Sequence, residues 1–368
     1  MEFYYYFIFA AAFFTLQLLV WNLVRTLAWL SHLTPRNRKI LLAAALTALN
    51  MLPAAAFLRL GISFKWIGAL FAVLWLVFIV STLTFCILKL GRNRAGLEGR
   101  LKAAYPLVLT ALAAVAVYHA YTPRTVYYSV QIDKPLAEPL RIGLASDLHL
   151  GRLVGKRQID RLAALFAAEK VDMVLLAGDI MDDSTEAYTA GNLQSALRRL
   201  KAPLGVYAAL GNHDYMVEPQ KVRQELEKAG LTVLEDESVS PDGRFYVVGR
   251  KDDMVKNRRQ ADALLAGVDT EKPVFLVEHR PTEFPKLSTL PVDLAVAGHT
   301  HKGQIAPANL IAQAVNFMNY GYRRIGSGHF IVTSGFGFWA VPFRLGSQSE
   351  IAVIDVRGTP PARAYGSQ

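Results

Sequence analysis

The sequence has few charged residues for its length and almost no cysteine. Charged residues make up 19% of the 368 residues and hydrophobic residues 52%, a balance that excludes a disordered or low-complexity chain. The single cysteine, Cys86, excludes an internal disulfide bond. Acidic side chains are scarcest in the first third, where residues 1–121 hold only Glu2 and Glu98.

The positive charge is concentrated in that same third. Residues 1–121 carry eleven lysines and arginines, whereas the remaining 247 residues carry 29 basic and 28 acidic side chains. A nucleic-acid-binding domain needs a basic face of its own, so no nucleic-acid partner is expected from the nearly neutral remainder.

Four long apolar runs fill the first third, and each approaches the roughly 20 residues that a helix needs to cross a bilayer. Aromatic residues, including Phe3 to Tyr6, gather at the ends of these runs, as is typical of side chains at the lipid headgroups. A soluble helical bundle is disfavoured because the runs lack a polar face. We therefore expect a multi-pass protein of the inner (plasma) membrane, with a transmembrane region over residues 1–121. The expected spans are Phe3 to Val24, Ile40 to Leu58, Trp66 to Leu88 and Ala104 to Tyr121.

Lysines and arginines in the loops between these runs predict the orientation. The first loop holds four basic residues, the second holds only Arg59 and Lys65, and the third holds five, Arg92 among them. Basic loops stay in the cytoplasm, so both termini and the domain over residues 122–368 are predicted to be extracytoplasmic.

From about Leu140 the pattern changes to short β-rich runs that alternate with amphipathic segments, typical of an α/β domain with parallel strands at its start. The later strands follow one another more closely along the sequence, so we expect part of the sheet to be antiparallel. Helices are expected at Lys156 to Lys170 and Pro219 to Ala229. The expected strands are Arg141 to Ala145, Met173 to Ala177, Gly205 to Ala209, Phe245 to Gly249, Val274 to Glu278, Leu294 to Ala297, Phe330 to Thr333 and Ile351 to Asp355.

Polar motifs stand at the ends of five of these strands. Because ligands bind outside the carboxyl ends of strands in α/β sheets, these loops are expected to meet in one crevice. Imidazole, carboxylate and amide groups are metal ligands, and this set suits Mn, Fe or Zn better than Mg or Ca. The motifs are Asp147-Leu148-His149, Gly178-Asp179, Gly211-Asn212-His213-Asp214, His279 and Gly298-His299-Thr300-His301.

Each motif has an ordinary alternative when it is taken alone. A single aspartate after a strand is as readily a helix cap, and a single histidine is more often a plain polar residue. The spacing in Asp147-x-His149 and His299-x-His301 sends both side chains of a pair the same way if the backbone is extended. The ordered combination of five motifs is what favours a metal site.

These motifs resemble the calcineurin-like metallophosphoesterase superfamily. Ser146 to Gly151, Gly335 to Gly337, Pro342 to Arg344 and Glu350 to Ile351 are similar to its membrane-associated bacterial branch, over roughly residues 125 to 357. Lys302 stands where that branch usually has glycine.

The resemblance implies a β-sandwich flanked by helices and a pair of divalent metal ions. It implies that Asp147, His149 and His301 bind the first ion and that Asp179 bridges the two. A set of three residues would bind the second ion: Asn212, His279 and His299. His213 would then be the general acid, with its ring oriented by Asp214.

The implied activity is that of a metal-dependent phosphoric ester hydrolase, a phosphodiesterase or phosphatase, which cleaves a phosphoester or pyrophosphate bond by a metal-bound hydroxide. Membrane anchoring makes a membrane lipid or a lipid-linked phosphate an attractive substrate. One alternative is a UDP-linked acylated-sugar pyrophosphatase of lipid A synthesis, which requires a cytoplasmic site. Another is a non-catalytic metal-binding sensor on a membrane transporter. The oligomeric state is left open.

Two further segments have competing interpretations. Asp252 and Asp253 follow a strand, and a structural turn is favoured over a catalytic role. The apolar run over residues 336–343 is either the end of a core strand or a loop that contacts the bilayer or an acyl chain.

The orientation can be tested with fusions at the C-terminus. We expect an alkaline phosphatase fusion to be active and a green fluorescent protein fusion to be dark, because phosphatase matures only outside the cytoplasm. A fluorescent fusion without phosphatase activity would reject the predicted orientation.

Overall fold

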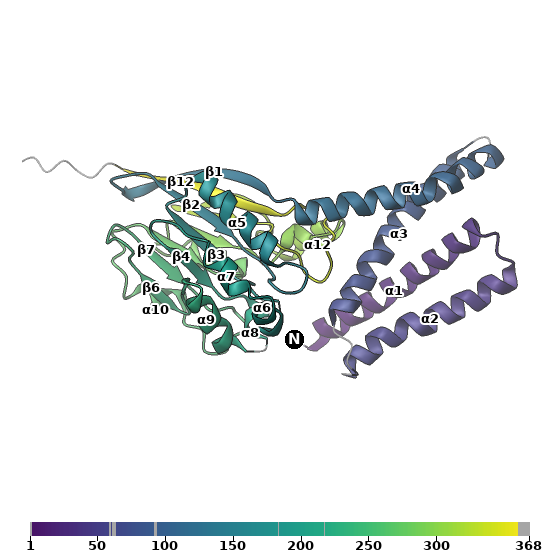
Figure 1. Cartoon of the computed structure of the whole chain (residues 1–368), viewed down its shortest axis with the longest axis horizontal. Coiled ribbons are helices and arrows are strands. Elements are labelled where there is room, and N and C mark those ends of the chain that lie inside the picture. The colour runs from purple at the N-terminus through teal and green to yellow at the C-terminus, as the bar shows by residue number, and fades with distance from the viewer. Residues whose placement is uncertain are drawn as a thin grey trace, which may run out of the picture. The chain divides into compact units, whose positions relative to one another are not determined.

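The computed structural model describes residues 2–58, 60, 64–91, 94–182, 184–216 and 218–359. The chain divides into two compact units, Met1–Val117 and Tyr118–Gln368 (Figure 1). Two residues used in the orientation argument, Arg59 and Arg92, lie outside the described residues, as do the side chains of residues 3–6.

The first unit is built from long helices. The described residues contain four helices that are long and apolar enough to cross a membrane, as the sequence predicted. Each overlaps one of the four expected spans. Their bounds are α1 Glu2–Leu30, α2 Pro35–Phe57, α3 Phe64–Leu90 and α4 Arg94–Tyr121.

Polar side chains link three of these helices. Thr26 of α1 donates a hydrogen bond of 2.8 Å to Ser81 of α3, and Ser81 lies 2.8 Å from the Tyr105 hydroxyl of α4. All three residues are buried. Interhelical hydrogen bonds of this kind help to hold apolar helices together where the surroundings offer no other partner.

The second unit contains two six-stranded sheets. Eight of the strands correspond to the eight that the sequence predicts, with ends that shift by a few residues. The first sheet has the order β1 Arg124–Pro135, β12 Glu350–Thr359, β2 Leu140–Ala145, β3 Met173–Ala177, β4 Val206–Ala209 and β5 Thr232–Val233. The second has the order β10 Gly321–Ile325, β11 Gly328–Val332, β9 Leu294–Ala297, β8 Val274–Val277, β7 Tyr246–Gly249 and β6 Glu237–Val239.

Parallel pairing forms the centre of both sheets. Strands β2, β3 and β4 are parallel, as expected, and so are β7, β8, β9 and β11. Antiparallel pairs are β12 with β2, β6 with β7, and β10 with β11. The later strands that form the second sheet are therefore antiparallel only at its two outer pairs. Its central strands are parallel, so their carboxyl ends lie at one edge of that sheet.

The sheets pack face to face, and helices cover their outer faces (Figure 1). Successive residues of β3 point to opposite faces of the sheet and show this arrangement. Leu175 packs into the core between the sheets, and Leu176 packs under the outer helices. The expected β-sandwich flanked by helices is thus confirmed. The remaining elements are α5 Lys156–Glu169, α6 Glu186–Ala190, α7 Leu193–Leu197, α8 Asn212–Tyr215, α9 Pro219–Lys228, α10 Ala261–Leu265, η1 Pro281–Glu283, α11 Phe284–Leu287, η2 His301–Gly303 and α12 Ala308–Val315.

Replacing Phe275 with alanine tests the core between the sheets. Phe275 is fully buried and packs against Phe245 with ring centroids 5.3 Å apart. We expect Phe275→Ala to lower the free energy of unfolding by about 3–5 kcal/mol, because it leaves a cavity. Pulse proteolysis of the detergent-solubilised full chain in urea would measure the change. The exposed Leu153→Ala is the control, and an equal effect of both variants would contradict the assignment of this core.

Candidate metal centre

The site lies where strands of both sheets end. Asp147 and His149 follow β2, Asp179 follows β3, and Asn212 begins α8 after β4. From the second sheet, His279 follows β8, and the pair His299 and His301 follows β9. Because the central strands of each sheet run parallel, their carboxyl ends meet at one edge. The structure brings all seven expected metal ligands together there.

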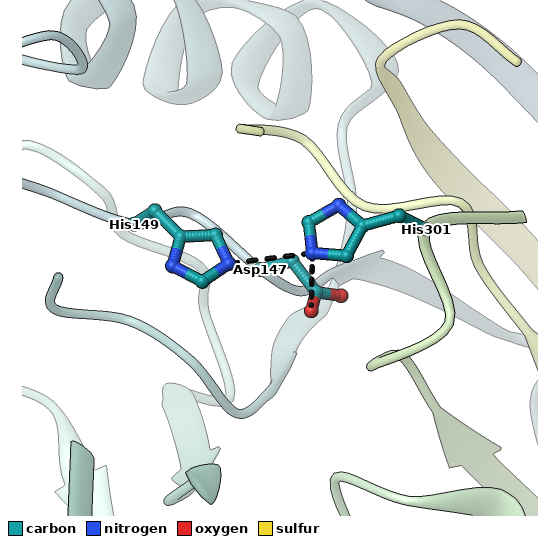
Figure 2. A group of neighbouring side chains, drawn as sticks. All are labelled: Asp147, His149 and His301. Atoms are coloured by element: carbon teal, nitrogen blue, oxygen red, sulfur yellow. Dashed lines mark hydrogen bonds and ion pairs between the residues drawn. The ribbon is translucent and has the colours of Figure 1, made fainter. Parts of the chain in front are cut away.

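The first cluster contains Asp147, His149 and His301, and Figure 2 shows the His301 ring linked by dashed lines both to His149 and to the Asp147 carboxylate. Nε2 of His301 lies 3.3 Å from Asp147 Oδ1 and 3.3 Å from Nε2 of His149. All three residues are buried. Ligands about 2.1 Å from one cation lie about 3.0–3.5 Å from one another, so these spacings suit a shared ion.

The second cluster surrounds Nε2 of His279. That atom lies 3.1 Å from Asp179 Oδ2, 3.2 Å from Asn212 Oδ1 and 3.2 Å from His299 Nδ1. Nδ1 of His279 lies 2.9 Å from the carbonyl oxygen of Ala177. Because a carbonyl oxygen can only accept, Nδ1 carries the hydrogen, and in the neutral ring Nε2 is left as the ligand atom.

Asp179 stands between the two clusters. Its Oδ2 atom lies 3.1 Å from His279 Nε2 and 3.9 Å from His149 Nε2. Its Oδ1 atom accepts a hydrogen bond of 2.8 Å from the backbone N–H of His213. These His and Asp clusters are consistent with a dimetal site in which one carboxylate faces both positions.

The backbone around the ligands is strained. Asp147, His149, Asp179, His299 and His301 all have φ between 47° and 69°, the left-handed region that favours glycine. The backbone at Asp147-x-His149 and His299-x-His301 is therefore not extended, so the condition for the spacing argument is not met. The left-handed turns aim these side chains instead, and strain of this kind collects at functional sites.

Two glycines allow this crowding. A Cβ atom added at Gly178, whose φ is +81°, would lie 2.7 Å from Cβ of His279. One added at Gly211 would overlap the Asp179 carboxylate and lie 2.8 Å from Cγ of His279. The absence of a side chain at Gly178 and Gly211 therefore lets the loops of the two sheets approach each other closely.

Burial and neighbouring charges shift the pKa values in the site. Burial works against the charged form of His279, but the Asp179 and Asp147 carboxylates outweigh it and raise its pKa to about 10. Burial also opposes the charge on Asp179, yet His279 and the other histidines hold the pKa of Asp179 below its usual range. The pKa of His299 falls to about 3, because of burial first and then of His279. Carboxylates that favour a proton on His279 also attract a divalent cation.

His213 lies at the edge of the first cluster. It is half-buried, its ligand atom lies within 4.8 Å of those of His149 and Asp179, and its ring centroid is 5.0 Å from that of His149. The Asp214 carboxylate accepts hydrogen bonds of 2.8 Å from Met181 N and 2.9 Å from Gly211 N. The expected orientation of the His213 ring by Asp214 stays a prediction, since these contacts of Asp214 go to backbone. Burial, together with Asp179, raises the pKa of Asp214 to about 6.

The two segments with competing interpretations are resolved in part. Asp252 accepts a hydrogen bond from Met254 N, so the expected turn is present, and the absence of a catalytic role stays a prediction. Both Asp252 and Asp253 also pair with Arg280, the residue after His279. In the run over residues 336–343, Phe338 is buried in the core and Trp339 is 36% exposed.

Sequence reasoning gave no role to one fully buried residue, Arg344. Its Nη2 atom lies 3.2 Å from His301 Nδ1 and donates a hydrogen bond of 2.6 Å to the Gly337 carbonyl. Burial lowers the pKa of Arg344 to about 10. The only signal was its place in the Pro-Phe-Arg motif.

Lys302, which has the left-handed φ of 52° natural to glycine, places its ammonium 4.2 Å from the Tyr320 ring centroid.

Metal content tests the shared position of Asp179. We expect Asp179→Asn to lower bound metal from about two ions per chain to well below one, because both positions lose a charged ligand. His299→Ala should lose the ion of the second cluster only. Elemental analysis of the purified full chain measures both variants, with the exposed Glu186→Gln as control. Equal losses in Asp179→Asn and His299→Ala would contradict a shared carboxylate.

Comparisons with known proteins agree with this geometry. Residues 140–303 match the calcineurin-like phosphoesterase family. A protein of Helicobacter pylori (strain J99) described as an uncharacterized metallophosphoesterase is 30% identical over 269 residues, which cover 71% of this chain and 72% of the relative. A second, from Aquifex aeolicus, is 30% identical over 67% of this chain and 97% of its own length.

A relative from Danio rerio also combines spans with such a domain. It is described as a transmembrane protein with metallophosphoesterase domain and is 29% identical over 80% of this chain and 72% of its own length. Among solved structures, TT1561 of Thermus thermophilus is 11% identical, with a TM-score of 0.38, over 55% of this chain and 93% of that chain. A structural similarity this low supports no further conclusion. From the sequence relatives and the site geometry together, the chain belongs to the calcineurin-like metallophosphoesterase family.

Proposed function

We propose that the chain is a hydrolase that uses two divalent cations to cleave a phosphoester or pyrophosphate bond. The observation that carries this proposal is the position of Asp179 Oδ2, which lies 3.1 Å from His279 and 3.9 Å from His149. One buried carboxylate between two sets of imidazoles suits a pair of ions better than a single ion.

The proposed ligands divide by cluster. Asp147, His149 and His301 would hold the first ion, and Asn212, His279 and His299 would hold the second. This mixture of imidazole, carboxylate and amide favours Mn, Fe or Zn. When bound, the two cations would polarise the phosphoryl group and lower the pKa of the attacking water.

His213 is the proposed general acid. It stands beside both His149 and Asp179 without belonging to either proposed ligand set, and it is only half-buried, so its ring can face a substrate. Its backbone N–H donates to Asp179, which couples its position to that of the bridging carboxylate. A proton from this imidazole would neutralise the leaving oxygen as the phosphorus–oxygen bond breaks.

Asp214 is proposed as a positioning residue. Its carboxylate accepts hydrogen bonds from Ile180 and Met181 after β3 and from Gly211 after β4. It therefore ties together the two loops that present Asp179 and His213. Arg344 would support the opposite side of the site through His301.

The substrate is proposed to be a lipid or lipid-linked phosphate. The support is the covalent link between this domain and four candidate membrane spans, which keeps the site close to a bilayer. The extracytoplasmic placement stays the prediction from the basic loops.

Leaving-group dependence tests the role of His213. With the manganese-loaded full chain, we expect His213→Ala to lower kcat about 10²- to 10⁴-fold on an alkyl phosphate ester, whose leaving oxygen needs a proton. The loss should be much smaller on bis-p-nitrophenyl phosphate, because p-nitrophenolate leaves unprotonated.

Two controls complete this test. His32→Ala, an exposed histidine of the first unit, should leave both rates unchanged. Elemental analysis should find His213→Ala still loaded with metal. An equal loss on both substrates would contradict the general-acid role, and a metal-loaded wild-type chain without activity on any phosphoester would contradict the proposed function.

A further inference from the structure

Helix α12 exposes apolar side chains to its surroundings. Leu310 is 61% exposed, Ile311 63% and Val315 66%. All residues of α12 are described, and none of them is buried. Ile311 and Val315 are one turn apart and lie on the same side of the helix, with Leu310 beside them.

The inner side of α12 is small and polar. Asn309, Ala312 and Asn316 recur at helical spacing and are half-buried. Asn316 donates a hydrogen bond of 2.8 Å to the Ala312 carbonyl, and Asn319 donates one of 3.5 Å to the Asn309 carbonyl. The helix therefore inverts the usual arrangement, in which a surface helix turns its apolar side toward the core.

Helix α12 packs through its inner side against the segment that begins at His301. Gly303, two residues after His301, touches the helix so closely that an added Cβ would overlap Asn309. The Gln304 side chain exchanges hydrogen bonds of 3.0 and 2.9 Å with the backbone of Trp339. The Trp339 ring centroid is 6.4 Å from that of His213.

An exposed aromatic residue follows α12 directly and is in contact with an arginine. Phe317, just after α12, is 45% exposed, and the guanidinium of Arg323 lies 5.1 Å from its ring centroid. Aromatic side chains and arginines favour the headgroup region of a bilayer, where an apolar ring and a cation both find partners.

We propose that α12 and Phe317, flanked by Arg323, form a surface that inserts into the headgroup region of a bilayer containing anionic lipids. Two features of the chain favour a bilayer as the partner of this surface. Four candidate spans keep the domain within reach of a bilayer, and Arg323 complements anionic headgroups. This inference concerns lipid contact alone and does not depend on the proposed hydrolase activity.

Lipid quenching in nanodiscs tests the contact. Cys86 is the only cysteine, so a Cys86→Ser full chain accepts one fluorophore at Ile311→Cys. The control is Gln224→Cys, an exposed position of the polar helix α9. In nanodiscs of phosphatidylcholine and phosphatidylglycerol with spin-labelled chains, the Ile311 label should lose most of its fluorescence and the Gln224 label little.

Two outcomes would overturn the proposal. One is quenching at Ile311 no stronger than at Gln224. The other is a label at Ile311 that is shielded only as protein concentration rises, because a second copy of the chain would then cover α12.

Two further variants distinguish an effect on lipid contact from an effect on folding. Arg323→Gln should weaken the quenching at Ile311, and quenching in that variant should no longer increase with the phosphatidylglycerol content. Leu310→Gln combined with Ile311→Gln should leave the urea midpoint in pulse proteolysis unchanged, since neither side chain is buried. Loss of folding in this double variant would contradict the assignment of an unpartnered surface.

Discussion

The Asp179 carboxylate is the contact on which the site depends. It is 2% exposed, so its negative charge needs partners inside the protein, and it finds them in His279, in His149 and in the backbone N–H of His213. The absence of a side chain at Gly211 is what makes room for it. Two ions held on either side of this carboxylate would complete the compensation of its charge.

The sandwich explains why ligands from distant parts of the chain meet. Both sheets have parallel centres, so β2, β3 and β4 of the first sheet and β8 and β9 of the second end at one edge. Each sheet alone would supply an incomplete ligand set. Packing through residues such as Phe275 fixes the distance between the sheets, and hence the distance between Asp179 and His279.

The sequence predicted much of this arrangement because hydrophobic runs and polar strand ends are local patterns. The eight main strands and the five polar motifs at strand ends needed only such patterns and their order. The choice of seven ligands among those motifs came from the family resemblance. The left-handed backbone at Asp147 was not predictable, because it arises from the contact of loops far apart in the chain. Arg344 was missed for the same reason, since its burial against His301 is a tertiary effect. From the sequence alone, α12 resembles an ordinary apolar segment. That its apolar side is exposed could not be predicted, because this depends on which side of the helix faces the rest of the protein.

Electron paramagnetic resonance of the manganese-loaded full chain tests the central claim most directly. Ions that share the Asp179 carboxylate would lie about 3.5–4 Å apart, a distance at which their spins couple. The account predicts the multiline spectrum of a coupled pair, converted by Asp179→Asn into the spectrum of isolated ions or lost altogether. A six-line spectrum of isolated manganese in the fully loaded wild-type chain would contradict the account.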